Sequence, residues 1–424
     1  MKSSLNTTFS LLASAADHLD RQAVLHRIRR KNKAQRGVRT LGRTGIDRLI
    51  PLNHRSGNLL LSGGGQDTRN RLIVQSCLQD ASVGLPTLIV HEGNRPLEQM
   101  LQSRFAGRRY FRIINASNPY YDPIFRLGDT ELCHLLSDAA PPDHPIGSAG
   151  ALYLRALASL LRKKGVAPYV RMLANCPHDR LDELIGAMER DGTLSAAEAN
   201  ACRSDLRTGS AERADIEYFL QQLELESPIL AWKRHLSRCT SAAECVARGG
   251  ILSLDASSFS KRAQLSLIGA EIAHCAQDTT PLRVVVDTSC LTGCEPLADT
   301  LKNSPCLVWT LSTPDLGQMT GGDPAALSDW LARSQRAVLF AHGLRTSELL
   351  SDNLGLCDQL EAVHTKAGNN VLGRLGYNFG RQSAITTVAR RERVVAPEEL
   401  VRLGPNGFIL LDNAAFSLSR GTLR

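Results

Sequence analysis

The sequence predicts an α/β fold in which a parallel sheet is flanked by helices and interrupted by an inserted all-α domain. Short apolar runs alternate with segments of helical spacing in the first and last parts of the chain, as in parallel sheets covered on both faces. An early run leads through three glycines into a helical segment, and between about residues 130 and 246 only helical spacing occurs. We therefore predict a basic N-terminal arm at 1–37, an α/β domain at 38–128 and 247–424, and an all-α domain at 129–246.

The composition is that of a soluble globular protein. The 424 residues suffice for about two domains, and 43% of them are hydrophobic and 22% charged. No apolar run approaches the ~18 residues of a membrane helix. The apolar stretch at 9–16 is too short and too broken for a signal peptide, so we expect an amphipathic helix there. These features predict a cytoplasmic protein.

The cysteines point to the same compartment. Eleven of them are spread from Cys77 to Cys357, mostly inside apolar segments, which indicates reduced thiols and no disulfide framework. The closest pair, Cys290 and Cys294, has no cluster of His or Cys beside it, which argues against a zinc site.

Positive charge is concentrated near the N-terminus. Residues 21–43 hold nine Lys or Arg and no acid, and without them the formal net charge would change from +8 to −1. Such an arm suits nucleic-acid phosphates or an anionic membrane surface, although a solvated tail explains it equally well. The candidate nucleic-acid-binding residues are Arg27, Arg29, Arg30, Lys31 and Lys33.

The glycines at 63–65 have the frame of a phosphate-binding loop (P-loop). A strand at 58–62 precedes them, and we expect a helix from about residue 70 to 81. Glycine lets a loop turn its N–H groups toward phosphates, and the following helix directs its positive end at them. A tight turn without a ligand explains three glycines more simply. If the loop binds nucleotide, the residues concerned are Gly63, Gly64, Gly65, Thr68, Arg69 and Asn70.

Three of the four diagnostic positions of the P-loop motif differ here. Thr68 stands at the second glycine, Arg69 at the lysine and Asn70 at the hydroxyl residue. Arginine is longer and forked, so it replaces a compact ammonium poorly. A neutral amide oxygen is a weak Mg²⁺ ligand. ATP and Mg²⁺ are therefore cofactors only if the altered site still binds them.

The remaining elements follow from the same patterns. We expect a short hairpin or edge strands at 38–43 and 49–52, and an extended, proline-bounded segment at 118–124. Further strands are predicted at 87–91, 110–114, 250–255, 282–288, 306–313 and 336–341. Helices are predicted at 97–105, 149–163, 167–174, 181–190, 196–206, 211–223, 262–276 and 324–334.

The order of the short sequence motifs along the chain indicates a protein family. After the glycine loop come a strand ending at His91-Glu92, the phrase Asn118-Pro119 to Asp122-Pro123, the helical insertion, an acidic strand ending at Asp287, a strand at 308–312 and a closing phrase at 394–408. This order resembles that of the type IV coupling proteins, the TraG/TraD-type members of the FtsK-HerA group of ring ATPases. The resemblance implies a RecA-like P-loop domain, partners in conjugation or type IV secretion, and attachment to the inner membrane at most through those partners.

The departures from that family concern catalysis. The family's acidic strand ends in Asp-Glu, where the aspartate helps to hold Mg²⁺ and the glutamate orients the attacking water, but here it ends Asp287-Thr288. The glutamine of the family's sensor strand is replaced by Leu311. Asp287 is therefore either a relic metal ligand or a strand-end residue that caps a turn.

Two hypotheses remain. The first is a catalytically degenerate coupling-protein-like subunit, a pseudo-ATPase that acts as scaffold, adaptor or ring partner, with an active coupling ATPase paralogue as one candidate partner. The second is an active, ATP-driven DNA translocase that uses Arg69 and Asp287 in an unorthodox site. The basic arm fits either hypothesis.

Overall fold

The computed structural model describes residues 19, 22–34, 36–51, 57–108, 110–230, 238–257, 261–277, 280–287, 295–368 and 381–424. Within these residues no helix combines the length and apolar character needed to cross a membrane. The predicted helix at 9–16 and the pair Cys290 and Cys294 lie outside the described part, whose nine cysteines are all free thiols.

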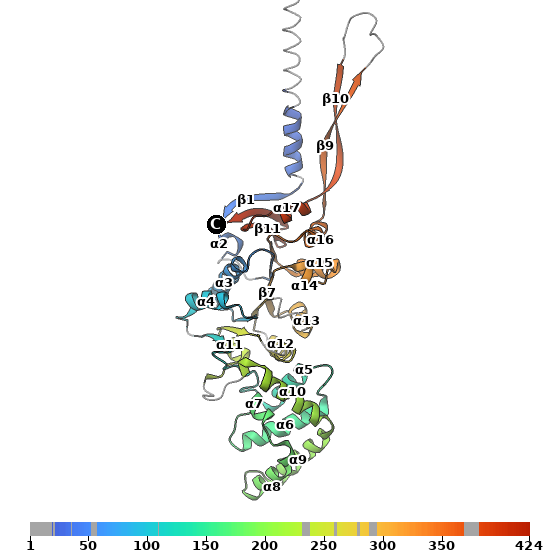
Figure 1. The fold of residues 1–424 in the computed structure, drawn as a ribbon. Helices are drawn as coiled ribbons and strands as arrows, with labels where there is room; N and C mark the ends of the chain where they lie inside the picture. The colour runs from blue at the N-terminus through green and yellow to red at the C-terminus, as the bar shows by residue number, and fades with distance from the viewer. Residues whose placement is uncertain are drawn as a thin grey trace, which may run out of the picture.

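A large, mostly parallel sheet forms the centre of the molecule (Figure 1). Its ten strands have the order β1-β12-β11-β8-β2-β7-β6-β3-β5-β4, and only β11 runs antiparallel to its two neighbours. The predicted α/β fold is thus confirmed. The strands are β1 (Val38–Thr44), β2 (Leu59–Ser62), β3 (Thr87–His91), β4 (Phe111–Ile114), β5 (Ile251–Asp255), β6 (Leu282–Asp287), β7 (Leu307–Thr313), β8 (Arg336–Leu339), β11 (Gly407–Asp412) and β12 (Ser417–Leu423).

Helices cover both faces of this sheet. Successive side chains of a strand point to opposite faces, so Leu59 and Leu61 pack in one core and Leu60 in the other. The first core also contains apolar side chains of α2 (Ile46–Leu49), α3 (Gln66–Val83) and α4 (Arg95–Phe105). The second core is completed by α12 (Lys261–Gln277), α13 (Glu295–Asn303), α14 (Leu316–Met319), α15 (Pro324–Arg333), α16 (Leu344–Leu354) and α17 (Pro397–Val401).

From residue 129 onward, the described chain between β4 and β5 is mostly helical. The described residues from 129 to 247 contain no named strand, and their buried side chains are continuous with the second core. Thr240 forms one isolated bridge, to Tyr121. The helices are α5 (Asp129–Ala139), α6 (Ser148–Lys163), α7 (Val170–Ala174), η1 (His178–Arg180), α8 (Leu181–Arg190), α9 (Ala196–Thr208), η2 (Ser210–Glu212), α10 (Arg213–Glu226), η3 (Pro228–Leu230) and α11 (Ala242–Ala247).

The sequence left two alternatives for 38–43 and 49–52, a short hairpin or edge strands. Residues 38–44 do form an edge strand, β1, which pairs in parallel with the distant β12, but the described part of this segment forms no hairpin because the chain turns into α2 at residue 46. This pairing joins the two ends of the α/β domain. Because the partner strand lies almost four hundred residues away in the sequence, no local pattern indicates it.

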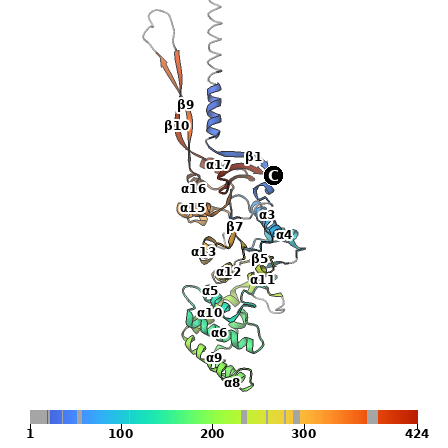
Figure 2. The same ribbon diagram turned by 180° about the vertical axis from the view of Figure 1, so that it is seen from behind.

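A long hairpin was not predicted at all. Strands β9 (Leu356–Gly368) and β10 (Arg381–Arg393) pair antiparallel over their full length and project from the end of the sheet near α16 and α17. The described part of the basic arm is ordered beside them as a helix at 22–34. In both views this helix and the hairpin lie side by side, far from α6–α9 (Figures 1 and 2).

Candidate functional site

Three neighbouring strands bring the candidate site residues together. Strand β7 lies between β2 and β6, and all three are parallel, so their carboxyl ends meet at one edge of the sheet. There Ser312 of β7 is in register with Asp287 of β6 on one side and with Leu61 of β2 on the other. The predicted glycine loop follows β2 directly and lies at this same edge.

The loop is shorter than the sequence suggested. Helix α3 begins at Gln66, not near residue 70, so the connection between β2 and α3 consists of Gly63, Gly64 and Gly65 alone. The physical reason is that Gln66-Asp67-Thr68-Arg69-Asn70 contains no glycine or proline to delay the helix, and Asp67 favours its first turn. Thr68, Arg69 and Asn70 are consequently helical residues, and no extended loop is left to wrap a phosphate.

The backbone N–H groups of the loop are also not arranged as in a phosphate-binding loop. The N–H of Gly63 donates to the carbonyl of Thr313 at 3.0 Å, and the N–H of Gly64 donates to the carbonyl of Ala341 at 3.1 Å. A phosphate-binding loop keeps such N–H groups for the ligand. Here both are engaged by the ends of β7 and of the segment after β8.

Arg69 occupies the space in front of the loop carbonyls. Its Nη1 donates to the carbonyl of Gly63 at 2.9 Å and to that of Gly64 at 2.7 Å, and its Nε lies 3.2 Å from the Ser312 hydroxyl. The side chain is only 6% exposed, and burial lowers the pKa of the guanidinium while nearby Asp287 opposes that shift. The start of a helix favours an anion. This site instead holds a cation, compensated by carbonyl oxygens and one carboxylate.

Asn70 is turned away from any metal position. Its amide forms a reciprocal pair with the amide of Asn94, with both N···O distances at 2.9 Å. The same Asn94 oxygen accepts from the backbone N–H of Leu97 and so caps the start of α4. The amide oxygen that could have faced Mg²⁺ is therefore used to join α3 to α4.

The glycines are required by close packing. Gly63 and Gly64 have φ angles of 81° and 64°, in the left-handed region. A Cβ on Gly63 would lie 2.6 Å from the carbonyl oxygen of Ala341, and one on Gly64 would lie 2.8 Å from Cβ of Phe340. The segment after β8 therefore lies directly against the loop.

His342, which the sequence analysis did not single out, fixes that contact. Its Nδ1 lies 2.7 Å from the carbonyl of Phe340 and must carry the proton, since a carbonyl can only accept. Its Nε2 then accepts from the hydroxyl of Ser62 at 2.7 Å. Burial lowers the pKa of His342, so the neutral ring that this arrangement requires is favoured.

These residues do not fit ATP and Mg²⁺ in the conformation described. Two loop N–H groups and the Asn70 amide are engaged, and the guanidinium of Arg69 fills the position opposite the loop carbonyls. Asp287 has the location expected of a metal-binding acid, at the end of β6, but the residues that follow it, Thr288 included, lie outside the described part.

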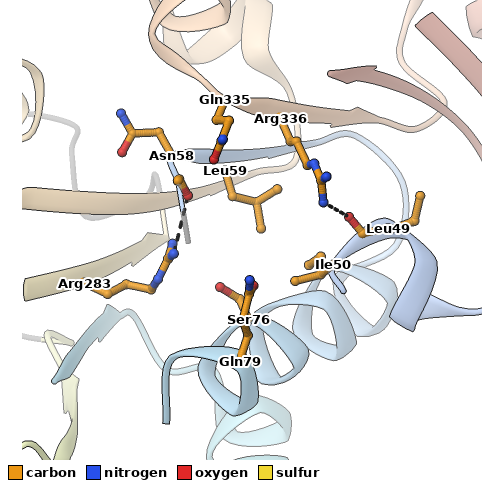
Figure 3. Close-up of a pocket in the computed structure, with 10 residues that line it drawn as sticks. Leu49, Ile50, Asn58, Leu59, Ser76, Gln79, Arg283, Gln335 and Arg336 are labelled. Carbon is orange, nitrogen blue, oxygen red and sulfur yellow. Dashed lines mark hydrogen bonds between the residues drawn. The ribbon is translucent and has the colours of Figure 1, made fainter. Parts of the chain in front are cut away.

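A small cavity lies at the other end of the same central strands, where β2, β6 and β8 begin. It has a volume of about 40 Å³ and is lined by Arg283, Gln79 and Arg336, among others (Figure 3). A cavity needs roughly 10–15 Å³ of such volume to hold one water molecule, so this one has room for water but not for a nucleotide. Arg283 is held there by Asp80 of α3, whose Oδ2 lies 2.5 Å from its Nε.

A second cluster of possible metal ligands lies at the ends of β3 and β5. Ligand atoms of His91, Glu98 and Asp255 lie within 4.8 Å of one another. However, Nδ1 of His91 accepts from the backbone N–H of Asn94 at 3.3 Å, so the proton is on Nε2, which faces Ser253 at 3.1 Å. A protonated Nε2 cannot ligate a metal. The geometry therefore favours a hydrogen-bonded cluster.

The basic arm presents its charges on two faces of one helix. Its five candidate residues are all exposed. The side chain of Asn32 fixes the helix to the hairpin, because its amide exchanges hydrogen bonds of 2.8 and 2.7 Å with the backbone of Leu360. Arg29 and Lys33 line a cavity of about 380 Å³ between this helix, β1 and β12, whereas Arg27, Arg30 and Lys31 do not.

A parallel sheet with a glycine loop after one strand and an acid at the end of another has the arrangement seen in the P-loop ATPase fold. No family model and no curated protein matches the sequence. Solved structures of bacterial coupling proteins, by contrast, match almost the whole chain. The resemblance to coupling proteins is thus confirmed for the fold.

Several of the matching structures are of the coupling protein TrwB. The unbound monoclinic form of the conjugative coupling protein TrwBdeltaN70 is 19% identical, with 93% of this chain and 91% of that chain covered at a TM-score of 0.52. TrwB in complex with ADP and Mg²⁺ is 17% identical, with the same coverage and a TM-score of 0.51. TrwB with the non-hydrolysable ATP analogue ADPNP is 16% identical, again with coverage of 93% and 91% and a TM-score of 0.51.

Proposed function

We propose that this protein is a catalytically degenerate coupling-protein-like subunit, which serves as scaffold, adaptor or ring partner in a conjugation or type IV secretion apparatus. The fold shared with TrwB supports the setting. The observation that carries the loss of catalysis is the position of Arg69, whose guanidinium is bound by the carbonyls of Gly63 and Gly64. Other secretion or conjugation subunits, including an active coupling ATPase paralogue, are the expected partners.

A substrate-transfer assay in the native host tests this role. The gene is deleted and complemented with wild type, Asp287→Ala or Arg69→Ala. A scaffold tolerates Asp287→Ala, so transfer should return to the wild-type level. Transfer lost with Asp287→Ala, although the variant is folded and present at normal abundance, would contradict the proposal.

The second candidate is an active ATP-driven DNA translocase. One observation favours it: Gly65 at the start of α3 supplies no side-chain cap, so the first-turn N–H groups are not satisfied by the N-cap residue. An anion could bind there if Arg69 swung aside toward Asp287. In that case Asp287→Ala would abolish transfer, and the same complementation assay separates the two functions.

A further inference from the structure

A cluster of arginines lies far from the glycine loop and from the basic arm. A cavity of about 360 Å³ opens beside edge strand β4, where the sheet meets the helical segment. Strand β4 is five strand steps from β2, which is about 24 Å at ~4.8 Å per step. Four exposed arginines line the cavity: Arg112, Arg126, Arg238 and Arg248.

The charges of this cavity are not balanced. Among the described residues that line it, Glu244 is the one acid. Its Oε1 lies 3.3 Å from Arg126 and 2.8 Å from Arg248, so a single carboxylate serves two guanidiniums. Four arginines against one glutamate leave a formal charge of +3 around a space large enough for a ligand. Such a cluster favours a bound anion, since like charges gathered in one hollow otherwise repel.

Each of the four guanidiniums lies over an aromatic ring, that of Arg126 at 5.0 Å from the ring centre of Phe125. Arg112 and Arg248 lie 5.4 and 5.3 Å from the ring centre of Tyr110, and Arg238 lies 5.8 Å from that of Tyr120. A guanidinium held over a ring points its N–H edges away from the ring, where they can meet phosphate oxygens, although Nη1 of Arg112 already donates to the carbonyl of Phe111 at 3.1 Å. Tyrosine and arginine planes are also the surfaces on which nucleobases stack.

The surrounding backbone is adapted to this arrangement. A Cβ at residue 250 would lie 2.1 Å from Cδ1 of Tyr110, so Gly250 makes room for the ring. Arg126 has a φ angle of 74°, in the left-handed region that non-glycine residues rarely adopt. Strained positions of this kind cluster at ligand sites, where the surrounding structure holds them.

We propose that this cavity binds a nucleoside phosphate, either as a free nucleotide or as one nucleotide of a single strand. Its volume lies in the range of small-ligand pockets and admits one nucleotide unit. The arginine edges bind the phosphate, and the base stacks against a tyrosine or guanidinium plane. The site is independent of the glycine loop, so its ligand binds whether or not that loop accepts ATP.

Equilibrium binding to the purified full chain tests the proposal. The probes are AMP and ATP, a short single-stranded oligothymidylate, inorganic phosphate and polyglutamate. We expect the double variant Arg112→Ala, Arg238→Ala to weaken nucleoside-phosphate binding at least tenfold. Glu244→Gln should tighten it severalfold, because Arg126 and Arg248 lose a competing carboxylate. The control Arg190→Ala, Arg207→Ala, which removes two exposed arginines from α8 and α9, should bind as wild type.

The probes also identify the source of the phosphate. Binding of AMP or ATP indicates a free nucleotide, and binding of the oligonucleotide alone indicates a strand. The proposal is overturned if neither binds, if inorganic phosphate or polyglutamate competes equally well, or if the Arg112, Arg238 double variant binds as wild type. Should that variant melt early, Arg112→Lys with Arg238→Lys keeps the charge and must still weaken binding, because lysine lacks the planar donor edge.

Discussion

Removal of the Arg69 side chain tests whether Arg69 stabilises the fold or is retained to bind a ligand. In the structure its guanidinium makes three hydrogen bonds, two to loop carbonyls and one to Ser312. Hydrogen bonds of charged groups contribute ~1.5–3 kcal/mol each. Desolvation of the buried guanidinium cancels a large part of this sum. We expect Arg69→Ala to lower the free energy of unfolding by about 2–4 kcal/mol, since the carbonyls of Gly63 and Gly64 lose their partner.

Urea denaturation of wild type and Arg69→Ala measures this change, with the slope of the transition checked for constancy. Arg71→Ala is the matched control, because Arg71 lies two residues further along the same helix with its side chain exposed. The control should change the free energy of unfolding by no more than about 0.5 kcal/mol. Residues retained to bind a ligand commonly lower the stability of the ligand-free protein. An Arg69→Ala variant more stable than wild type would therefore refute the reasoning and indicate an anion site awaiting its ligand.

Three further predictions concern other parts of the chain. Asp80→Asn should destabilise the protein by about 3–5 kcal/mol in chemical denaturation, since it leaves Arg283 buried without its carboxylate, and Asp80→Leu combined with Arg283→Leu should cost less. Burial raises the pKa of Glu271 from its ordinary 4.5 to about 7. Between those values the folded protein holds a proton that the unfolded chain has lost, so the free energy of unfolding should fall by about 1.4 kcal/mol per pH unit as pH rises. Glu271→Gln should flatten this part of the stability profile, and an unchanged slope would exclude Glu271 as its source. If the arm binds nucleic acid, neutralising its basic residues should weaken binding and reduce the slope of log binding constant against log salt concentration by about 0.9 per lost phosphate contact. One variant neutralises Arg27, Arg30 and Lys31, and the other Arg29 and Lys33. An unchanged slope in both variants would favour a solvated arm.

The sheet was predictable because its strands are buried on both faces. Strands such as β2 and β3 are short, nearly continuous apolar runs, and a run of that kind is visible without knowing its neighbours. The hairpin of β9 and β10 gives no such signal. The described side chains of β10 from 387 to 391 are all exposed, so no hydrophobic alternation marks it.

The site was predictable in place but not in geometry. Three glycines after an apolar strand located the loop, and the end of β6 located Asp287. The return of Arg69 onto the loop carbonyls, the amide pair of Asn70 with Asn94, and the contact of His342 with Ser62 all depend on pairings between distant segments. Polar residues at strand ends were the available signal for His342, and spacing alone could not say which of them would meet.

Steady-state ATP hydrolysis by the purified protein, with and without DNA, tests the central claim most directly. A competent site must bind phosphates, hold Mg²⁺ and orient a water. Here Arg69 and Asn70 are engaged by the fold itself. We predict negligible turnover for wild type, Asp287→Ala and Arg69→Lys alike, because restoring the lysine supplies neither a metal ligand nor a group that orients water. Substantial DNA-stimulated turnover in the wild type that Asp287→Ala abolishes would contradict the account and establish an active translocase.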